Sequence, residues 1–239
     1  MTSCFAAVKD LLFPPLCLGC GRRLESSRPP LFCPDCLADL VFIRSPCCHC
    51  CGIPFAAGVD HWCGDCLARH YAFDFARSLF LYEPPLSLLI RSLKFGGHLT
   101  GISTLGALTV RSGLLGLFGE PDLVVPVPLH RIRLRERGFN QALLIARGCF
   151  PQWKNRIETG LLLRRCSTIP QTLLTGKERR SNLKNAFSLA PGSNVAGKQV
   201  LLVDDVFTTG STVNECSRAL RSAGAGRIEV FTLARSLAR

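Results

Sequence analysis

The stretch from Val200 to Thr212 combines two adjacent carboxylates with a short run of hydroxyl side chains. Four apolar residues, Val200 to Val203, precede Asp204 and Asp205, which is the pattern of a buried strand with acids at its carboxyl end. Gly210 permits a tight turn, after which backbone amides at the start of a helix can donate to a phosphate. The hydroxyl donors beside it are Thr208, Thr209, Ser211 and Thr212. Because carboxylates repel phosphate, the two acids suit sugar hydroxyls and, indirectly, Mg²⁺.

Cysteine pairs separated by two residues occur four times in the first part of the chain. This spacing allows both thiolates of a pair to reach one tetrahedral Zn²⁺. The pairs are Cys17 with Cys20, Cys33 with Cys36, Cys48 with Cys51, and Cys63 with Cys66. They predict two structural zinc ions, bound by consecutive pairs or in a cross-braced arrangement. A redox site and spare buried thiols are the alternatives, which four pairs in a short segment disfavour.

The third pair can be chosen in two ways, because Cys47 and Cys50 have the same spacing. We favour Cys48 and Cys51, since a glycine follows that pair, as one follows the first pair. On this choice Cys47, Cys50 and Cys4 have no assigned role.

Positive charge is concentrated in residues 131–185, which hold 13 Lys+Arg and three Glu in a chain of formal net charge +12. Arg131, Arg133, Arg135 and Arg137 alternate, and in an extended conformation all four would project to one side. Such a row suits a polyphosphate or the phosphates of single-stranded DNA. The alternative is a solvated loop whose charge serves only the phosphate ligand.

The composition is that of a globular protein, with 47% hydrophobic and 19% charged residues among 239. No apolar run reaches the roughly 18–20 residues of a membrane span, so no membrane insertion is expected. The N-terminal segment lacks the basic start of a signal peptide. We therefore expect a cytoplasmic protein with reduced cysteines.

Eleven of the 14 cysteines lie in the first 66 residues, which indicates a zinc-binding domain over 10–70 and a second domain over 71–239. In the second domain, short apolar runs alternate with helical periods, which predicts an α/β fold with a parallel sheet and flanking helices. The expected strands are 122–127, 200–203 and 227–233, and the expected helices are 86–93, 99–118, 140–148 and 211–223. Lys94 and His98 flank two glycines and could reach the same anion as the hydroxyl loop.

These features together resemble the ComF family, phosphoribosyltransferase-like proteins associated with bacterial natural competence. Residues 200–212 resemble the motif with which type I phosphoribosyltransferases bind 5-phosphoribosyl 1-pyrophosphate (PRPP). Further matching segments are Leu93–Phe95, Pro126–Leu129, Arg137–Gln141, and Gln171 through Arg180, Asn182 and Phe187. The resemblance runs from about Cys17 to the end of the chain. It implies a double zinc ribbon followed by a type I phosphoribosyltransferase-like α/β domain.

The resemblance also implies roles for single residues. Asp204 and Asp205 would hold the ribose hydroxyls of PRPP, with Mg²⁺ nearby, and Thr208 to Thr212 would hold the 5-phosphate. His130 and Arg131 follow the first sheet strand, where such folds have a pyrophosphate loop. The mobile loop that closes over the site would carry Lys177, Arg179 and Arg180. Relatives of the hypoxanthine-guanine type have an acid at the position of Thr208, and threonine cannot replace that general base near neutral pH.

Two functions follow as expectations. The first is an accessory factor of DNA uptake and natural transformation that binds single-stranded DNA through Arg133, Arg135 and Arg137. Helicase or recombination proteins would be its partners. The second is an active Mg²⁺-dependent phosphoribosyltransferase of nucleotide metabolism, which transfers phosphoribosyl from PRPP to an unknown nucleophile. PRPP or a related ribose phosphate is a ligand in both.

Overall fold

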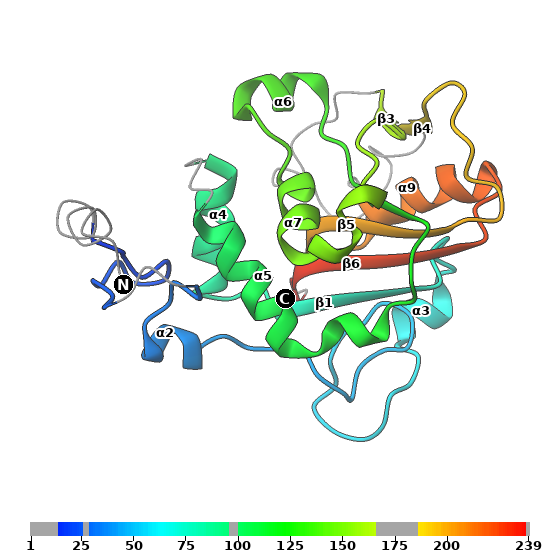
Figure 1. Cartoon of the computed structure of the whole chain (residues 1–239). Helices are drawn as coiled ribbons and strands as arrows, with labels where there is room; N and C mark the ends of the chain where they lie inside the picture. Colours follow the sequence, from blue (N-terminus) through cyan, green and yellow to red (C-terminus); the bar gives the residue numbers. More distant parts are fainter. Residues whose placement is uncertain (1–13, 26–28, 96–99, 166–185, 238–239) are drawn as a thin grey trace.

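The computed structural model describes residues 14–25, 29–95, 100–165 and 186–237. Figure 1 shows the arrangement of its elements. The strands are β1 (Phe75–Leu81), β2 (Leu123–Pro126), β3 (Leu162–Arg164), β4 (Phe187–Leu189), β5 (Gln199–Phe207) and β6 (Arg227–Arg235). The helices are α2 (Pro34–Ala38), α3 (Gly64–Ala68), α4 (Leu86–Phe95), α5 (Thr100–Ser112), α6 (Arg131–Arg137), α7 (Gln141–Cys149) and α9 (Ser211–Ser222), with 3-10 helices η1 (Leu114–Leu117) and η2 (Pro151–Arg156). Within these ranges, no helix combines the length and apolarity of a membrane span.

Within the described part of the chain, four parallel strands form the main sheet in the order β1-β6-β5-β2. Because parallel neighbours need crossover connections, helices cover both faces, and the predicted α/β fold class is confirmed. The expected strands correspond to β2, β5 and β6. β1 and the antiparallel two-stranded sheet of β3 and β4 are additional to the strands that the sequence predicts.

Alternate residues of β5 face two different cores. Leu201 and Val203 pack with α4, α5 and α7 on one face, whereas Val200 and Leu202 pack with α9 on the other. All four side chains are completely buried. The continuous apolar run in the sequence is therefore explained by a strand that is covered on both sides.

The helix predicted over 99–118 is interrupted, which corrects that expectation. α5 ends at Ser112, and Gly113 has a φ of +71°, in the left-handed region that glycine adopts most readily. The short helix η1 follows. This turn brings Phe118 back into the core, where its ring centroid lies 6.0 Å from that of Phe231.

The cysteine-rich segment packs directly onto the sheet. The amide of Ile43 donates to the carbonyl of Leu79, and the amide of Leu81 donates to that of Val41, so this connection runs antiparallel along β1. Buried cysteines extend both cores: Cys17, Cys33 and Cys36 on the side of α4 and α5, and Cys48, Cys51 and Cys66 on the side of α9. The segment thus shares the hydrophobic core of the larger domain, which a chain of its length cannot build alone.

Candidate functional site

The two adjacent acids lie on β5 itself, because the strand continues past its apolar run to Phe207. Asp204 is paired with Thr232 of β6 in the parallel ladder. The amide of Asp205 donates to Oδ1 of Asp204 at 2.9 Å. The acids are therefore fixed at the carboxyl end of a central strand, where open α/β sheets bind their ligands.

A lysine from a distant part of the sequence faces the second acid. Nζ of Lys94, near the end of α4, lies 2.6 Å from Oδ2 of Asp205. The two side chains are only 24% and 16% exposed, so the ion pair is poorly screened by solvent. The sequence suggests only that Lys94 could reach an anion; the tertiary structure brings it to Asp205.

Asp204 has an unusual proton affinity. Desolvation by burial raises the pKa of its carboxyl group to about 7, and the charge of Asp205 acts in the same direction. Lys94 and Arg164 oppose this shift without cancelling it. Near neutral pH this carboxyl group therefore exists in both protonation states, and its protonated form can donate a hydrogen bond as well as accept one.

The loop that follows β5 takes its shape from Gly210. This residue has a φ of +72°, and a Cβ atom there would lie 2.5 Å from Cζ of Phe207. Gly210 also forms the N-cap of α9 and offers no side-chain oxygen to the first helical amides. A phosphate oxygen can take the place of the missing cap, where the helix dipole favours negative charge.

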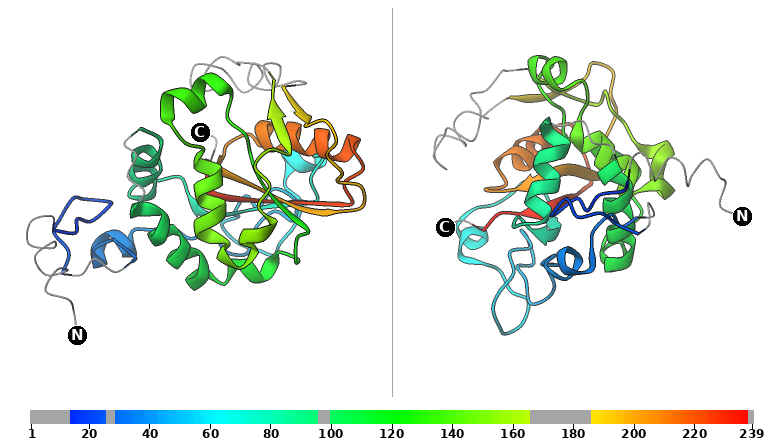
Figure 2. Two further views of the ribbon diagram at one scale, coloured as in Figure 1. Left: turned by 45° about the horizontal axis from the view of Figure 1, so that its top comes forward. Right: turned by 90° about the vertical axis from the view of Figure 1, so that its left-hand side faces the viewer.

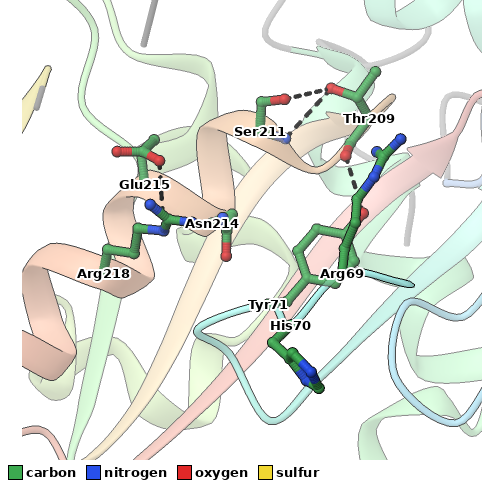
Figure 3. A pocket seen from close by; sticks show the side chains of 8 residues that line it. All are labelled: Arg69, His70, Tyr71, Thr209, Ser211, Asn214, Glu215 and Arg218. Carbon is green, nitrogen blue, oxygen red and sulfur yellow. Dashed lines mark hydrogen bonds and ion pairs between the residues drawn. The ribbon is translucent and has the colours of Figure 1, made fainter. Parts of the chain in front are cut away.

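The acids and the loop border one cavity of about 370 Å³. Its polar lining comprises Tyr82, Lys94, Asp204, Asp205, Thr208, Ser211, Thr212 and Ser236, with the backbone of Gly210. Thr209 is the exception among the predicted phosphate ligands. Its Oγ1 lies 2.7 Å from Oγ of Ser211, and it borders a neighbouring pocket formed with Arg69 to Tyr71 (Figure 3).

The segment with alternating arginines is helical, which contradicts the extended conformation that would align all four guanidiniums. α6 projects from the main sheet at the same end as the pair β3 and β4 (Figures 1 and 2). None of its residues is buried. His130 caps this helix, since its Nδ1 accepts from the amide of Ile132 at 3.4 Å. Successive helical residues are rotated by about 100°, so residues two apart point in nearly opposite directions. The arginines therefore form two pairs on opposite sides: Arg131 with Arg135, and Arg133 with Arg137.

The second pair has particular partners. Nη1 of Arg133 lies 3.1 Å from Oε2 of Glu136. Burial lowers the pKa of Arg137, and the charge of Asp205 acts in the opposite direction. Arg137 is therefore half-buried and does not belong to an exposed row of guanidiniums.

Two of the remaining predicted phosphate-binding residues do not line the cavity, and the structure does not describe the others. His130 and Arg131 are at the start of α6, and neither is among the described residues that line the cavity. Lys177, Arg179 and Arg180 lie outside the described residues, as does His98.

The eight predicted zinc ligands form two clusters. Each contains two consecutive pairs, with its four sulfur atoms within 4.8 Å of one another: Cys17, Cys20, Cys33 and Cys36 in the first, and Cys48, Cys51, Cys63 and Cys66 in the second. In each cluster one sulfur–sulfur distance is 3.7 Å, close to the roughly 3.8 Å expected for thiolates bound to a tetrahedral zinc. Consecutive pairs therefore share a site, which excludes cross-bracing, and the third pair is Cys48 with Cys51.

Both clusters stabilise thiolates in the same way. The amide of Cys33 donates to Sγ of Cys17 at 3.2 Å, and the amide of Cys63 donates to Sγ of Cys48 at 3.3 Å. Burial opposes ionisation of Cys17 and Cys48, but neighbouring backbone amides outweigh it and lower their pKa values to about 6 and about 7. Four sulfur donors with such amide support fit structural zinc.

The sequence interpretation misses three residues: Tyr82 and Ser236 line the cavity, and the charge of Arg164 acts on Asp204. Tyr82 and Ser236 directly follow β1 and β6, so both lie at the carboxyl edge of the sheet. The run Phe75–Leu81 is largely apolar but contains no β-branched residue, so it is a weak signal for a buried edge strand. A prediction of this strand would have placed Tyr82 at the carboxyl edge of the sheet. Arg164 has no such signal, because the strand that carries it has only three residues.

Comparisons with known proteins match a domain family to each of the two parts of the chain. The double zinc ribbon domain matches residues 8–67, and the phosphoribosyl transferase domain matches residues 145–239. Competence protein F of Haemophilus influenzae is 36% identical over 230 residues, covering 92% of this chain and 90% of that protein. DNA utilization protein YhgH of Salmonella typhimurium is 36% identical over 95% of this chain and its own full length. Competence protein ComFC of Bacillus subtilis is 28% identical over 85% of this chain and 84% of its own.

Proposed function

Because the chain belongs to the ComF family of competence-associated proteins, we propose that it binds PRPP or a related ribose phosphate and handles single-stranded DNA during DNA uptake or utilisation in the cytoplasm. One observation carries the ribose-phosphate half: the two acids of β5, the hydroxyl loop and Lys94 line the same cavity. The names of the relatives, which refer to competence and DNA utilization, support the other half.

In the proposed complex the ribose hydroxyls contact Asp204 and Asp205, and the 5-phosphate contacts the loop from Thr208 to Thr212. Lys94 offsets the negative charge of Asp205, which reduces the repulsion between this acid and the phosphate. Carboxylate oxygens are donors that fit Mg²⁺, but Lys94 already holds one of them. Asp204 and the second carboxylate oxygen of Asp205 would hold Mg²⁺, which would supply charge neutralisation for the pyrophosphate.

The test is a calorimetric titration of PRPP into the zinc-loaded protein, with and without Mg²⁺, and of two glycine variants. We expect saturable binding that Mg²⁺ strengthens. Gly210→Ala should weaken it by about tenfold or more, because the new Cβ meets Phe207 and displaces the loop amides.

Gly197→Ala is the matched control. Gly197 has a φ of +69°, close to the +72° of Gly210, but a Cβ there would meet nothing within 4 Å. Both variants thus incur similar backbone strain, and only Gly210→Ala clashes at the loop. Equal PRPP affinities in the two variants, or no PRPP binding to the parent protein, would contradict the proposed site.

Phosphoribosyl transfer is the second candidate, and the composition of the cavity argues for binding without it. Transfer to a nitrogen nucleophile needs a proton acceptor beside the incoming group. Thr208 has only a hydroxyl group there, and Asp204 is assigned to the ribose. Release of pyrophosphate in the presence of candidate bases would favour the transferase.

The proposed binding of single-stranded DNA predicts a specific role for the side of α6 that carries Arg131 and Arg135. Arg131 and Arg135 are exposed on the same side, without the Glu136 partner that Arg133 has. Arg131→Gln/Arg135→Gln should weaken binding of a single-stranded oligonucleotide several-fold. It should also reduce the slope of log K against log salt by about 1.4, since each phosphate contact on a single strand contributes roughly 0.7. Fluorescence anisotropy at several salt concentrations measures both quantities.

Arg111→Gln/Lys154→Gln is the control, because it removes the same charge from exposed residues of α5 and η2. If both double variants reduce the salt slope equally, the effect is one of net charge and the assignment to α6 is wrong.

A further inference from the structure

We propose that the second cysteine cluster holds the phosphate loop in its binding conformation, through Arg235 and Tyr71, so that anion affinity depends on the metal in this cluster and not on that in the first. The phosphate loop is residues Thr208 to Ser211. The inference rests on the proposed ribose-phosphate site and adds a reason for the fusion of a zinc ribbon to it.

Arg235 is the first connection. It is the last residue of β6 and is only 6% exposed. Its guanidinium donates to the carbonyl oxygen of Cys51 at 2.6 Å and to Sγ of Cys51 at 3.4 Å. Among the described residues, no carboxylate forms an ion pair with it, so the thiolates of a loaded cluster are its natural counter-charge.

The same guanidinium supports the base of the loop. Cζ of Arg235 lies 4.5 Å from the ring centroid of Phe207, and the amide of Ser236 donates to the carbonyl of Phe207 at 2.9 Å. The far edge of the Phe207 ring fills the space beside Gly210, which explains why a Cβ there would clash. Arg235 therefore links Cys51 to the turn of the phosphate loop through one aromatic ring.

Tyr71 is the second connection. It follows α3, the short helix that contains Cys66, and its ring stacks on Phe73 with centroids 4.7 Å apart. Its hydroxyl group donates to the carbonyl of Thr209 at 3.2 Å, as Figure 3 shows. One residue later, the amide of Ala72 donates to Oδ1 of Asn214 in the first turns of α9. The chain that leaves the second cluster thus holds the loop and the helix behind it.

The first cluster provides an internal comparison. It packs in the other core, where Gly19 closely approaches Pro85 at the start of α4. This is the end of α4 opposite to Lys94. Among the described contacts, none joins the first cluster to the phosphate loop. Loss of a ligand there removes a zinc site without removing Arg235 or Tyr71 from their partners.

The experiment compares Cys63→Ser with Cys20→Ser in the full-length protein, since each removes one ligand from one cluster. Zinc content is measured colorimetrically, and ribose 5-phosphate affinity by calorimetry. We expect either variant to lose about one zinc. Only Cys63→Ser should weaken ribose 5-phosphate by about tenfold or more, within the range of coupling between two sites. Unchanged affinity after loss of the second zinc, or an equal loss in both variants, would overturn the proposal.

Two further measurements separate this proposal from that of the ligand site. Tyr71→Phe keeps all eight thiols and the aromatic stack, so it should retain both zinc ions while ribose 5-phosphate binds several-fold more weakly. Hydrogen exchange at the amides of residues 208–211 needs no ligand, and it should accelerate in Cys63→Ser but not in Cys20→Ser.

If the parent protein binds no ribose 5-phosphate, the proposed function fails. The exchange rates then decide alone whether the second cluster supports the loop, and equal rates in the two variants would overturn the support.

Discussion

Removal of both zinc ions is expected to unfold the cysteine-rich segment together with β1 and the helices that pack beside it. Structural zinc contributes roughly 10–16 kcal/mol to the folding of small zinc domains, which is as large as the whole stability of many proteins. Cys17, Cys33 and Cys36 are buried in the core that contains α4 and α5. A free cluster of thiols would leave that core without its cross-links.

The extent of unfolding tests whether the cysteine-rich segment shares the core of the larger domain, as in the structure, or folds independently of the residues after 70. If the domains over 10–70 and 71–239 folded independently, chelation would unfold the first and leave the second largely folded. In the structure, the amide of Ala76 in β1 donates to the carbonyl of Cys50 at 2.6 Å, and residues 41–43 run along the same strand. Loss of the zinc segment therefore exposes one edge of the sheet and part of both cores.

The measurement is circular dichroism and urea denaturation of reduced protein, before and after zinc is removed by a strong chelator. We expect a marked loss of helical signal, a lower urea midpoint, and recovery of both when zinc is restored. Added Mg²⁺ should restore neither, because it prefers oxygen ligands. Full removal of zinc with an unchanged midpoint would contradict the expectation.

Replacement of both acids of β5 is expected to abolish ribose-phosphate binding. Asp204→Asn/Asp205→Asn replaces two carboxyl groups with amides, and a hydrogen bond from a hydroxyl group to each carboxyl group is worth roughly 1.5–3 kcal/mol when that group is charged. The combined loss corresponds to a decrease in PRPP affinity of about 100-fold or more. Asn keeps the size of the side chains, so the cavity is preserved. Calorimetry with PRPP and Mg²⁺ measures the effect, and Asp39→Asn, at an exposed position after α2, is the control.

The single variant Asp204→Asn should be more stable than the parent protein, which separates loss of binding from loss of folding. The pKa of Asp204 is raised from 3.8 to about 7, mainly by burial. Between these two values the folded protein keeps a proton that the unfolded chain has released, so this group's contribution to stability falls as pH rises from about 4 to 7. Asn cannot titrate, so the variant does not lose stability in this way. The difference in the free energy of unfolding between the variant and the parent protein should therefore grow from pH 4 to pH 7 and stay constant above pH 7, reaching at most about 4 kcal/mol.

Urea denaturation at pH 5 and pH 8 tests the sign. A larger stabilisation by Asp204→Asn at pH 8 than at pH 5 is the expected result. The reverse order would mean that the carboxylate is stabilised in the folded protein, for example by Lys94, and that burial does not dominate its environment.

Short segments of this sequence determine their own local structure and much of their chemistry. Val200 to Val203 predict a buried strand, Gly210 predicts a turn, and α9 begins directly after it, as expected. Asn140 caps α7 through a hydrogen bond from the amide of Ala142, two residues later. The spacing of the cysteine pairs likewise predicts the eight cysteines whose sulfur atoms form the two clusters. In each case the interacting groups are neighbours in sequence, so backbone geometry and side-chain type suffice to predict the arrangement.

The tertiary structure alone decided which distant groups meet. It brought Lys94 of α4 to Asp205 of β5, and Arg235 of β6 to Cys51. It also selected consecutive pairing of the cysteines, although cross-bracing satisfies the same spacing. The arginines of α6 alternate in sequence like a strand, yet capping by His130 and a turn at Gly138 enclose one short helix. Such choices depend on how separate elements bury their apolar faces together, and a linear pattern contains no information on the partner that each face will find.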